Sequence, residues 1–194
     1  MNRLITSLRA HTQSQHERLE SVTSLPQSLE SAEDLRRVLC TFLGFYTALD
    51  PALHESKADV LPSEITSRPR RSHVLRRDLV AMGLDECSLA NVPICTKLPT
   101  MLTPYHRWGV HYVVEGSALG GRVVRSHMKK HPELERWVGV VRFFSIYGSE
   151  TTSHWKNFIS ELEELNPSPL EHEQILEGAQ SVFATLIVWF QEQR

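Results

Sequence analysis

Apolar residues recur at intervals of three and four along most of this chain, whereas the alternation of β-branched residues that is typical of strands is nearly absent. The first such stripe contains Leu4, Leu8, Thr12, His16 and Leu19. This spacing matches the period of about 3.6 residues that places one face of a helix against a core. The pattern therefore predicts an all-α fold.

Proline, glycine and capping residues divide the periodic stretches into separate helices. Pro26 ends the first helix, and Ser31 caps the next, followed by acidic residues in its first turn. Gly83 marks the end of a short helix after a connector. The predicted helices cover residues 2–20, 31–49, 72–82, 105–130, 132–147, 150–165 and 170–193. We expect a single domain over residues 1–194, built as a bundle of roughly six to eight helices.

The composition argues against several classes of protein. Lys plus Arg is 21 and Asp plus Glu is 23, so a formal net charge of −2 supplies no positive field for nucleic acid. The three cysteines have no CxxC spacing, which favours a reducing cytoplasm over a disulfide framework or a thiolate zinc site. No window approaches the roughly 18 apolar residues of a membrane span. We therefore expect a cytoplasmic protein that binds neither nucleic acid nor membranes.

His16 is the first candidate functional residue, because it shares the apolar face of the first helix. An imidazole in a core needs a partner, since an unpaired buried polar group costs roughly 1–3 kcal/mol. Two interpretations stay open: a core histidine bonded to a carbonyl, or an axial ligand of a haem or metal. Arg9 lies two turns earlier, roughly 10 Å away at about 1.5 Å per residue, where it can hold a carboxylate of a ligand.

Three glycines, Gly116, Gly120 and Gly121, interrupt a stretch that otherwise reads as a helix. Each costs about 1 kcal/mol relative to alanine, so roughly 3 kcal/mol of helix stability is lost. One explanation is close packing of helices through small residues. The other is a bent helix whose bare backbone lies against a flat ligand.

Two further groups of residues have ordinary explanations beside functional ones. The aromatic residues between 143 and 158 suit a core, and Lys156 among them is either a solvated cation or a second carboxylate anchor. A set of basic residues is either a solvated face or a docking surface for an acidic protein partner. That set comprises Arg68, Arg70, Arg71, Arg76, Arg77, Arg122, Arg125, Lys129 and Lys130. No histidine follows a glutamate by three residues, which argues against a ferritin-like di-iron bundle.

Taken together and in order, three motifs resemble the haem oxygenase family, specifically its small bacterial biliverdin-producing members. The motifs are Leu8-Arg9-x-x-Thr12-x-x-x-His16-x-x-Leu19-Glu20, then Tyr112-x-x-Glu115-Gly116-Ser117-x-Leu119-Gly120-Gly121, and then Phe144-x-x-Tyr147-Gly148 with Trp155-x-x-Phe158. They extend across nearly the whole chain.

The resemblance implies that haem lies between a proximal helix and a kinked, glycine-rich distal helix. By this resemblance His16 is the iron ligand, and the residues over the reactive face are Gly116, Ser117 and Gly120. The remaining haem-binding residues that it implies are Arg9, Tyr112, Gly121 and Lys156, three of them near the propionates. Ser117 stands where animal-type members have an aspartate, so ordered water held by Ser117 and backbone carbonyls is expected to replace that carboxylate.

The implied activity is oxidative cleavage of haem to biliverdin, CO and ferrous iron, with haem and its iron as both cofactor and substrate. It needs O2 and electrons from a reductase or a ferredoxin- or flavodoxin-type protein, and its product can supply a bilin-dependent photoreceptor. Two alternatives stay open: a haem sensor or carrier of the same fold without turnover, and a related helical protein, akin to thiamin-processing proteins, that binds no haem.

Overall fold

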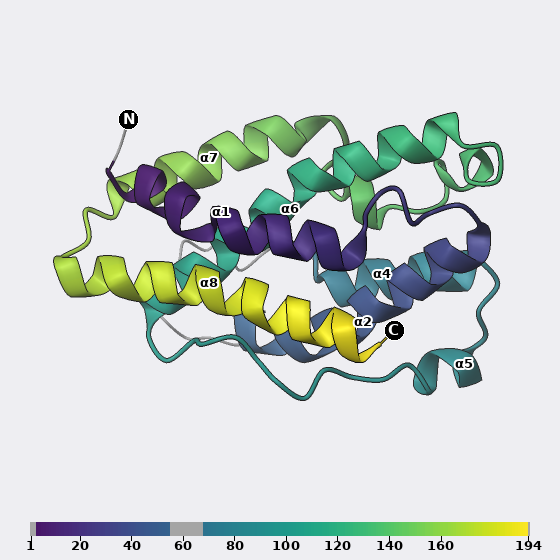
Figure 1. Ribbon diagram of the computed structural model, residues 1–194, viewed down its shortest axis with the longest axis horizontal. Coiled ribbons are helices and arrows are strands. Elements are labelled where there is room, and N and C mark those ends of the chain that lie inside the picture. The colour runs from purple at the N-terminus through teal and green to yellow at the C-terminus, as the bar shows by residue number, and fades with distance from the viewer. Residues whose placement is uncertain (1–2, 55–67, 194) are drawn as a thin grey trace.

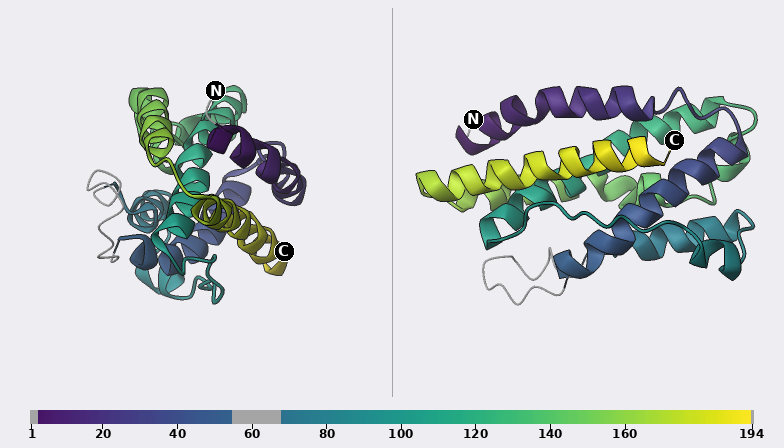
Figure 2. Two further views of the ribbon diagram at one scale, coloured as in Figure 1. Left: turned by 90° about the vertical axis from the view of Figure 1, so that its left-hand side faces the viewer. Right: turned by 60° about the horizontal axis from the view of Figure 1, so that its bottom comes forward.

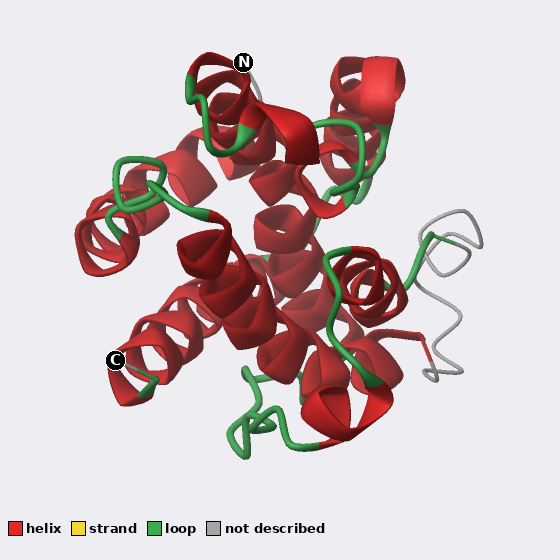
Figure 3. Cartoon of the chain, turned by 90° about the vertical axis from the view of Figure 1, so that its right-hand side faces the viewer, coloured by secondary structure: helices red, strands yellow, loops and turns green. Residues whose placement is uncertain are grey.

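The computed structural model describes residues 3–54 and 68–193, and Figure 3 shows only helices and loops in this part of the chain. The predicted all-α fold is confirmed. The α-helices are α1 (Arg3–Thr23), α2 (Ala32–His54), α4 (Arg71–Ala81), α5 (Glu86–Ala90), α6 (Pro104–Lys130), α7 (Thr151–Glu164) and α8 (Pro169–Glu192). Three short 3-10 helices lie between α6 and α7, namely η1 (Glu135–Trp137), η2 (Phe143–Ser145) and η3 (Gly148–Glu150).

Local capping chemistry sets the starts of the long helices. At the start of α2 the Ser31 hydroxyl accepts the Asp34 N–H at 3.1 Å and donates to the Asp34 carboxylate at 2.7 Å. At the start of α8, Ser168 and Glu171 form a reciprocal capping box. Because these bonds depend only on neighbouring residues, the sequence predicts these helix starts to within a residue.

The structure differs from the prediction between α6 and α7. The helix expected over residues 132–147 is wrong, because this stretch forms turns and the short helices η1 and η2. It begins with Pro132 and contains the run Val138-Gly139-Val140-Val141, which has low helix propensity. The sequence also gave no prediction of α5, whose start is capped by the Asp85 carboxylate accepting the Ser88 N–H at 2.8 Å.

Helix α8 packs closely against both α6 and α1. In Figure 1, α1 and α8 lie side by side in front of α6, and the second view in Figure 2 shows the same pairing of α1 with α8. Two glycines let α6 and α8 touch through their backbones. A Cβ on Gly109 would lie 2.0 Å from the Ile175 carbonyl oxygen, and one on Gly178 would lie 2.1 Å from that of His106.

Two buried carboxylates hold α4 against the rest of the bundle. Asp50 in α2 accepts the backbone N–H of Ser72 at 2.7 Å and its hydroxyl at 2.6 Å, so it caps the start of α4 from a distance. Asp78 in α4 accepts the backbone N–H groups of Arg142 and Phe143 at 2.8 and 2.7 Å. These bonds attach the start of α4 to α2 and the start of η2 to α4.

Two expectations from composition can be compared with the described residues. The cysteines Cys40, Cys87 and Cys95 are all free thiols. Among the helices of residues 3–54 and 68–193, none combines the length and the apolar character needed to cross a membrane. The same residues contain no cluster of three or more His, Cys, Asp or Glu side chains suited to hold a metal ion.

Candidate functional site

A cavity of about 580 Å³ lies between α1 and α6. Residues of α2, α4, α7, α8 and η2 add to its walls, and most of these residues are apolar or aromatic, among them Phe42, Phe144, Trp155 and Phe183. The volume falls within the range of about 300–1,000 Å³ that is typical of pockets for small molecules and cofactors. We call this space the α1–α6 cavity.

The α1–α6 cavity brings together most of the residues that the sequence singles out. Those that line it are His16, Tyr112, Gly116, Ser117, Gly120 and Gly121. Arg9 does not line the cavity, but its side chain hydrogen-bonds to Tyr112, which does. Lys156 lies on the exposed surface of α7 and does not line it, although the preceding residue, Trp155, does.

His16 faces the cavity rather than the core. Its side chain is 58% exposed, and its ring meets the edge of the Phe183 ring with the centroids 5.8 Å apart. The interpretation of His16 as a core histidine bonded to a carbonyl is therefore wrong. The Nδ1 atom lies 3.5 Å from Oε1 of Glu20, one turn further along α1. A carboxylate beside Nδ1 is the usual device that orients a ligating imidazole and leaves Nε2 for the metal.

The three glycines between residues 116 and 121 of α6 play different roles. A Cβ on Gly121 would lie 2.7 Å from the Phe144 carbonyl oxygen, so Gly121 lets η2 approach α6 closely. A Cβ on Gly116 would make ordinary contact with Trp155 at 3.4 Å, and one on Gly120 would meet nothing within 4 Å. Because Gly120 lines the cavity, a side chain there would occupy the cavity itself. Close packing therefore explains Gly121, whereas Gly120 leaves the open space that the flat-ligand explanation requires.

Polar groups gather where Ser117 reaches the cavity. The Ser117 hydroxyl donates to the Val114 carbonyl at 2.7 Å, and the Arg71 guanidinium donates to the same oxygen at 2.7 Å. Tyr46 hydrogen-bonds to Ser117, and burial raises the pKa of the Tyr46 phenol, which keeps its proton in place. Ser117, Arg71 and Tyr46 all line the cavity and form one hydrogen-bonding group, which we call the α6 polar cluster.

A buried carboxylate, Glu115, stands behind this cluster. The Tyr147 hydroxyl donates to its Oε2 at 2.8 Å, and the Arg68 guanidinium lies 3.0 Å from the same oxygen. Arg71 lies 3.9 Å from Oε1. Burial, and then the Glu115 charge, raises the pKa of Tyr147 well above its usual range, so this phenol stays a proton donor. Glu115 therefore helps to hold Arg71 in position through its charge, while the Val114 carbonyl accepts the hydrogen bond from Arg71.

The interpretation of the set of basic residues as a solvated face is wrong for two of its members. Arg68 and Arg71 turn inward to Glu115, with side chains only 10% and 4% exposed. Arg76 pairs with Glu86 in α5. The sequence offered one sign of this arrangement, because Glu115 stands beside Gly116 in the middle of a helix that must be largely buried. Its arginine partners are more than forty residues away, so spacing alone does not reveal the pairing.

His111 lies one turn before Glu115 and is buried. Burial lowers the pKa of its imidazole to about 4, with Glu115 acting in the opposite direction and Arg68, Arg71 and His54 adding to the decrease. Neither ring nitrogen has a hydrogen-bond partner among the described residues. His111 is therefore neutral at physiological pH.

This burial predicts that acid destabilises the protein through His111. The unfolded state binds a proton near pH 6.5 and the folded state only near pH 4, so stability is full above the first value and falls with pH between them. We expect this group to cost about 2 kcal/mol of unfolding free energy at pH 5 relative to pH 7. Urea unfolding at both pH values should show that the His111→Leu variant loses about 2 kcal/mol less unfolding free energy between pH 7 and pH 5 than the wild-type protein does. His11→Leu, on the exposed face of α1, serves as the control, and equal sensitivity of both variants would contradict the assignment.

Comparisons with known proteins agree with this architecture. The family model described as Heme oxygenase matches residues 2–192. A heme oxygenase from Xanthomonas campestris pv. campestris (strain 8004) is 34% identical over 116 residues, which are 59% of this chain and 64% of that protein. The match thus spans less than two thirds of that relative's length.

A solved structure supports the fold independently. The crystal structure of heme oxygenase from Neisseria meningitidis with NO and CO bound superposes with a TM-score of 0.76 at 20% sequence identity. The likeness covers 98% of this chain and 91% of that one, which confirms the predicted haem-oxygenase-like helical fold. Since the family model matches nearly every residue, the chain belongs to the heme oxygenase family.

Proposed function

We propose that this protein is a haem oxygenase that binds haem in the α1–α6 cavity and cleaves it to biliverdin, CO and ferrous iron. The observation that carries the proposal is that an accessible imidazole on α1 and the side-chain-free surface of Gly120 on α6 line the same cavity. Membership of the family supports the same conclusion.

The residues that line the cavity fit a haem. Its walls are mostly apolar, as a porphyrin ring requires, and the space at Gly120 is one that a single Cβ would begin to fill. The donor set also fits, because a histidine imidazole such as that of His16 is a common iron ligand. When bound, the haem supplies the O2 chemistry and is itself the molecule that is oxidised.

The chain's own residues bind and orient this substrate. His16 holds the iron through Nε2 while Glu20 orients the ring from the Nδ1 side. Arg9, together with the Tyr112 hydroxyl that it contacts, holds a propionate at the edge of the cavity. We propose Lys156 as a second propionate anchor, reaching from the exposed surface of α7.

Residues of α6 control what reaches the opposite face of the substrate. Gly116 and Gly120 keep bulky side chains away from the ring edge. In the α6 polar cluster the Ser117 hydroxyl donates its proton to the Val114 carbonyl and Tyr46 hydrogen-bonds to Ser117, so the remaining acceptor capacity of Ser117 Oγ can hold a water at the cavity wall. This cluster takes the place of a distal carboxylate, and ordered water on Ser117 can extend it.

The reaction also needs partners outside the chain. Electrons come from a reductase or a ferredoxin- or flavodoxin-type protein in the cytoplasm. Two uses of the products stay open: supply of iron to the cell, or supply of biliverdin as the chromophore of a bilin-dependent photoreceptor.

The proposal is tested by titrating the protein with hemin, followed by absorbance, and then adding ascorbate in air with catalase present. We expect saturable binding at one site per chain, then loss of the Soret band as a bilin spectrum grows. A haem complex that persists under reduction would instead indicate a haem sensor or carrier. If hemin does not bind, the cavity holds a different ligand and the proposal fails.

A further inference from the structure

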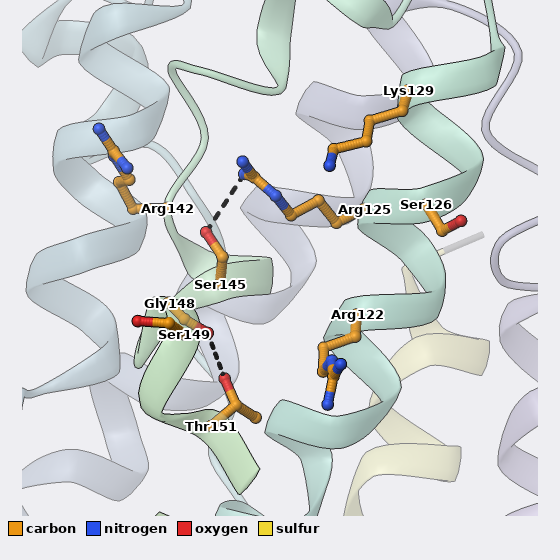
Figure 4. Close-up of a pocket in the computed structure, with 9 residues that line it drawn as sticks. All are labelled: Arg122, Arg125, Ser126, Lys129, Arg142, Ser145, Gly148, Ser149 and Thr151. Carbon is orange, nitrogen blue, oxygen red and sulfur yellow. Dashed lines mark hydrogen bonds between the residues drawn. The ribbon is translucent and has the colours of Figure 1, made fainter.

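The short helix η2 separates the α1–α6 cavity from a second space. This second space, of about 400 Å³, lies between the C-terminal half of α6 and the segment around η3 (Figure 4). Phe143 and Phe144 line the cavity, whereas Arg142 and Ser145 line the second space. Within residues 3–54 and 68–193, no residue lines both. The two spaces are therefore distinct sites that share a wall.

Four cations line this second space, which we call the cationic cleft. They are Arg122, Arg125 and Lys129 from α6, and Arg142 from the residue before η2 (Figure 4). Every other residue that lines it is serine, threonine or glycine, so no carboxylate is among them. In a protein of net charge −2, this is a local concentration of positive charge.

The positive charges of the cleft are only partly balanced by the described part of the chain, in which Asp78 interacts electrostatically with Arg142. No carboxylate of that part lies within ion-pair distance of any of the four cations, whereas arginines elsewhere pair with acidic residues. The acidic groups nearest in the chain make their hydrogen bonds with neutral donors rather than with the four cations. Glu150 accepts hydrogen bonds from Ser149 and Ser153, and Asp78 accepts the backbone N–H groups at the start of η2.

Neutral groups instead hold two of the guanidinium groups in place. Arg125 donates to the Val138 carbonyl at 2.6 Å and to the Ser145 hydroxyl at 3.4 Å, and Arg122 donates to the Thr152 hydroxyl at 3.0 Å. These bonds orient the side chains without removing their charge. Like charges held close together repel each other, and an anion between them relieves that repulsion. The cleft is therefore preorganised for an anion.

We propose that the cationic cleft binds a small molecule that carries a diphosphate group. Planar guanidinium groups match the oxygens of phosphate with paired hydrogen bonds. A terminal phosphate carries about −1.5 to −2 charges at pH 7 and the second phosphate of a diphosphate adds about one more, so a diphosphate offsets most of the charge of four cations, while a single carboxylate leaves most of it unpaired. One phosphate group also fills only a small part of the 400 Å³ of the cationic cleft, so the cleft has room for a larger ligand. This inference does not depend on the haem reaction.

The test is isothermal titration calorimetry of the haem-free full chain with inorganic pyrophosphate, in about 0.1 M chloride to screen weak surface binding. We expect one site per chain and an affinity at least about tenfold higher than for orthophosphate or for citrate. ADP distinguishes the source of the diphosphate. Binding of ADP as tight as that of pyrophosphate supports an organic diphosphate ligand, and much weaker binding assigns the cleft to pyrophosphate itself.

Single-charge variants locate the site. Arg125→Gln and Lys129→Gln should each weaken pyrophosphate binding, the first by about tenfold. Lys97→Gln is the matched control, because it removes the same charge from an exposed residue that pairs with Glu192 far from the cleft. Thermal unfolding of each variant verifies the fold, and Lys129→Gln serves if Arg125→Gln is unstable. Equal affinity in all three variants, no measurable pyrophosphate binding, or citrate binding as tight as pyrophosphate would each overturn the proposal.

Discussion

Replacing His16 with alanine is expected to lower haem turnover by at least about 100-fold without unfolding the protein. Loss of a group that only supports a metal ligand typically costs 10- to 100-fold, so loss of the ligand itself should cost no less. The side chain is 58% exposed and contributes little to the core, which is why the fold should persist. The measurement is the initial rate of haem loss under ascorbate, together with the absorption spectrum of the ferric complex.

The chain offers a matched control for this variant. His11 lies on the same helix, is exposed, and uses its Nδ1 to bond the Ser7 carbonyl at 2.8 Å. His11→Ala should therefore keep both the wild-type spectrum and the wild-type turnover. If His16→Ala also kept both, His16 would not be the iron ligand and the orientation proposed for haem in the cavity would be wrong.

Replacing Gly120 with leucine is expected to separate stability from ligand binding. No heavy atom lies within 4 Å of a Cβ at this position, so the leucine enters empty space in the cavity and the fold tolerates it. Removing a glycine from a helix interior should stabilise the haem-free protein by up to about 1 kcal/mol. The same side chain should weaken haem binding by about 10- to 100-fold, because it occupies the space of the ring.

Two other glycines provide controls for Gly120→Leu. Gly139 also has open space around its Cβ position but lies outside the cavity, so Gly139→Leu should leave haem affinity unchanged. Gly121→Ala should destabilise the protein, since its Cβ would lie 2.7 Å from a backbone oxygen. Hemin titration and thermal unfolding of the three variants measure both quantities. Tight haem binding by Gly120→Leu would show that the bare backbone at this position does not face the haem.

Much of the fold is predictable because it depends on interactions between neighbours in sequence. Ser31 and Ser168 begin their helices through bonds to residues three positions away. The stripe that carries His16 follows from helical periodicity, which also places it on a face shared with Thr12, a second residue that lines the cavity. Where the local signal was weak, as in the valine-rich stretch after Pro132, the predicted helix was wrong.

The polar part of the site was less predictable, because its partners are distant in sequence. Arg71 appeared as one member of a basic run, and only the tertiary structure places it against Glu115 and the Val114 carbonyl. Tyr46 lies on a different helix, α2, and only the tertiary structure brings its hydroxyl to Ser117. Periodicity identifies which face of a helix is buried, but it does not identify which charges meet there.

The glycine contacts between α6 and α8 have a mechanical consequence for the cavity. Helix α1 is attached to the bundle chiefly through α8, and α8 in turn touches α6 at Gly109 and Gly178. These two positions lie outside the cavity, yet they fix how far apart its walls stand. The contact between α6 and α8 at Gly109 and Gly178 thus sets the thickness of ligand that fits between α1 and α6, although it lies outside the cavity. Replacing either glycine with alanine would push α8 away from α6 and widen the cavity.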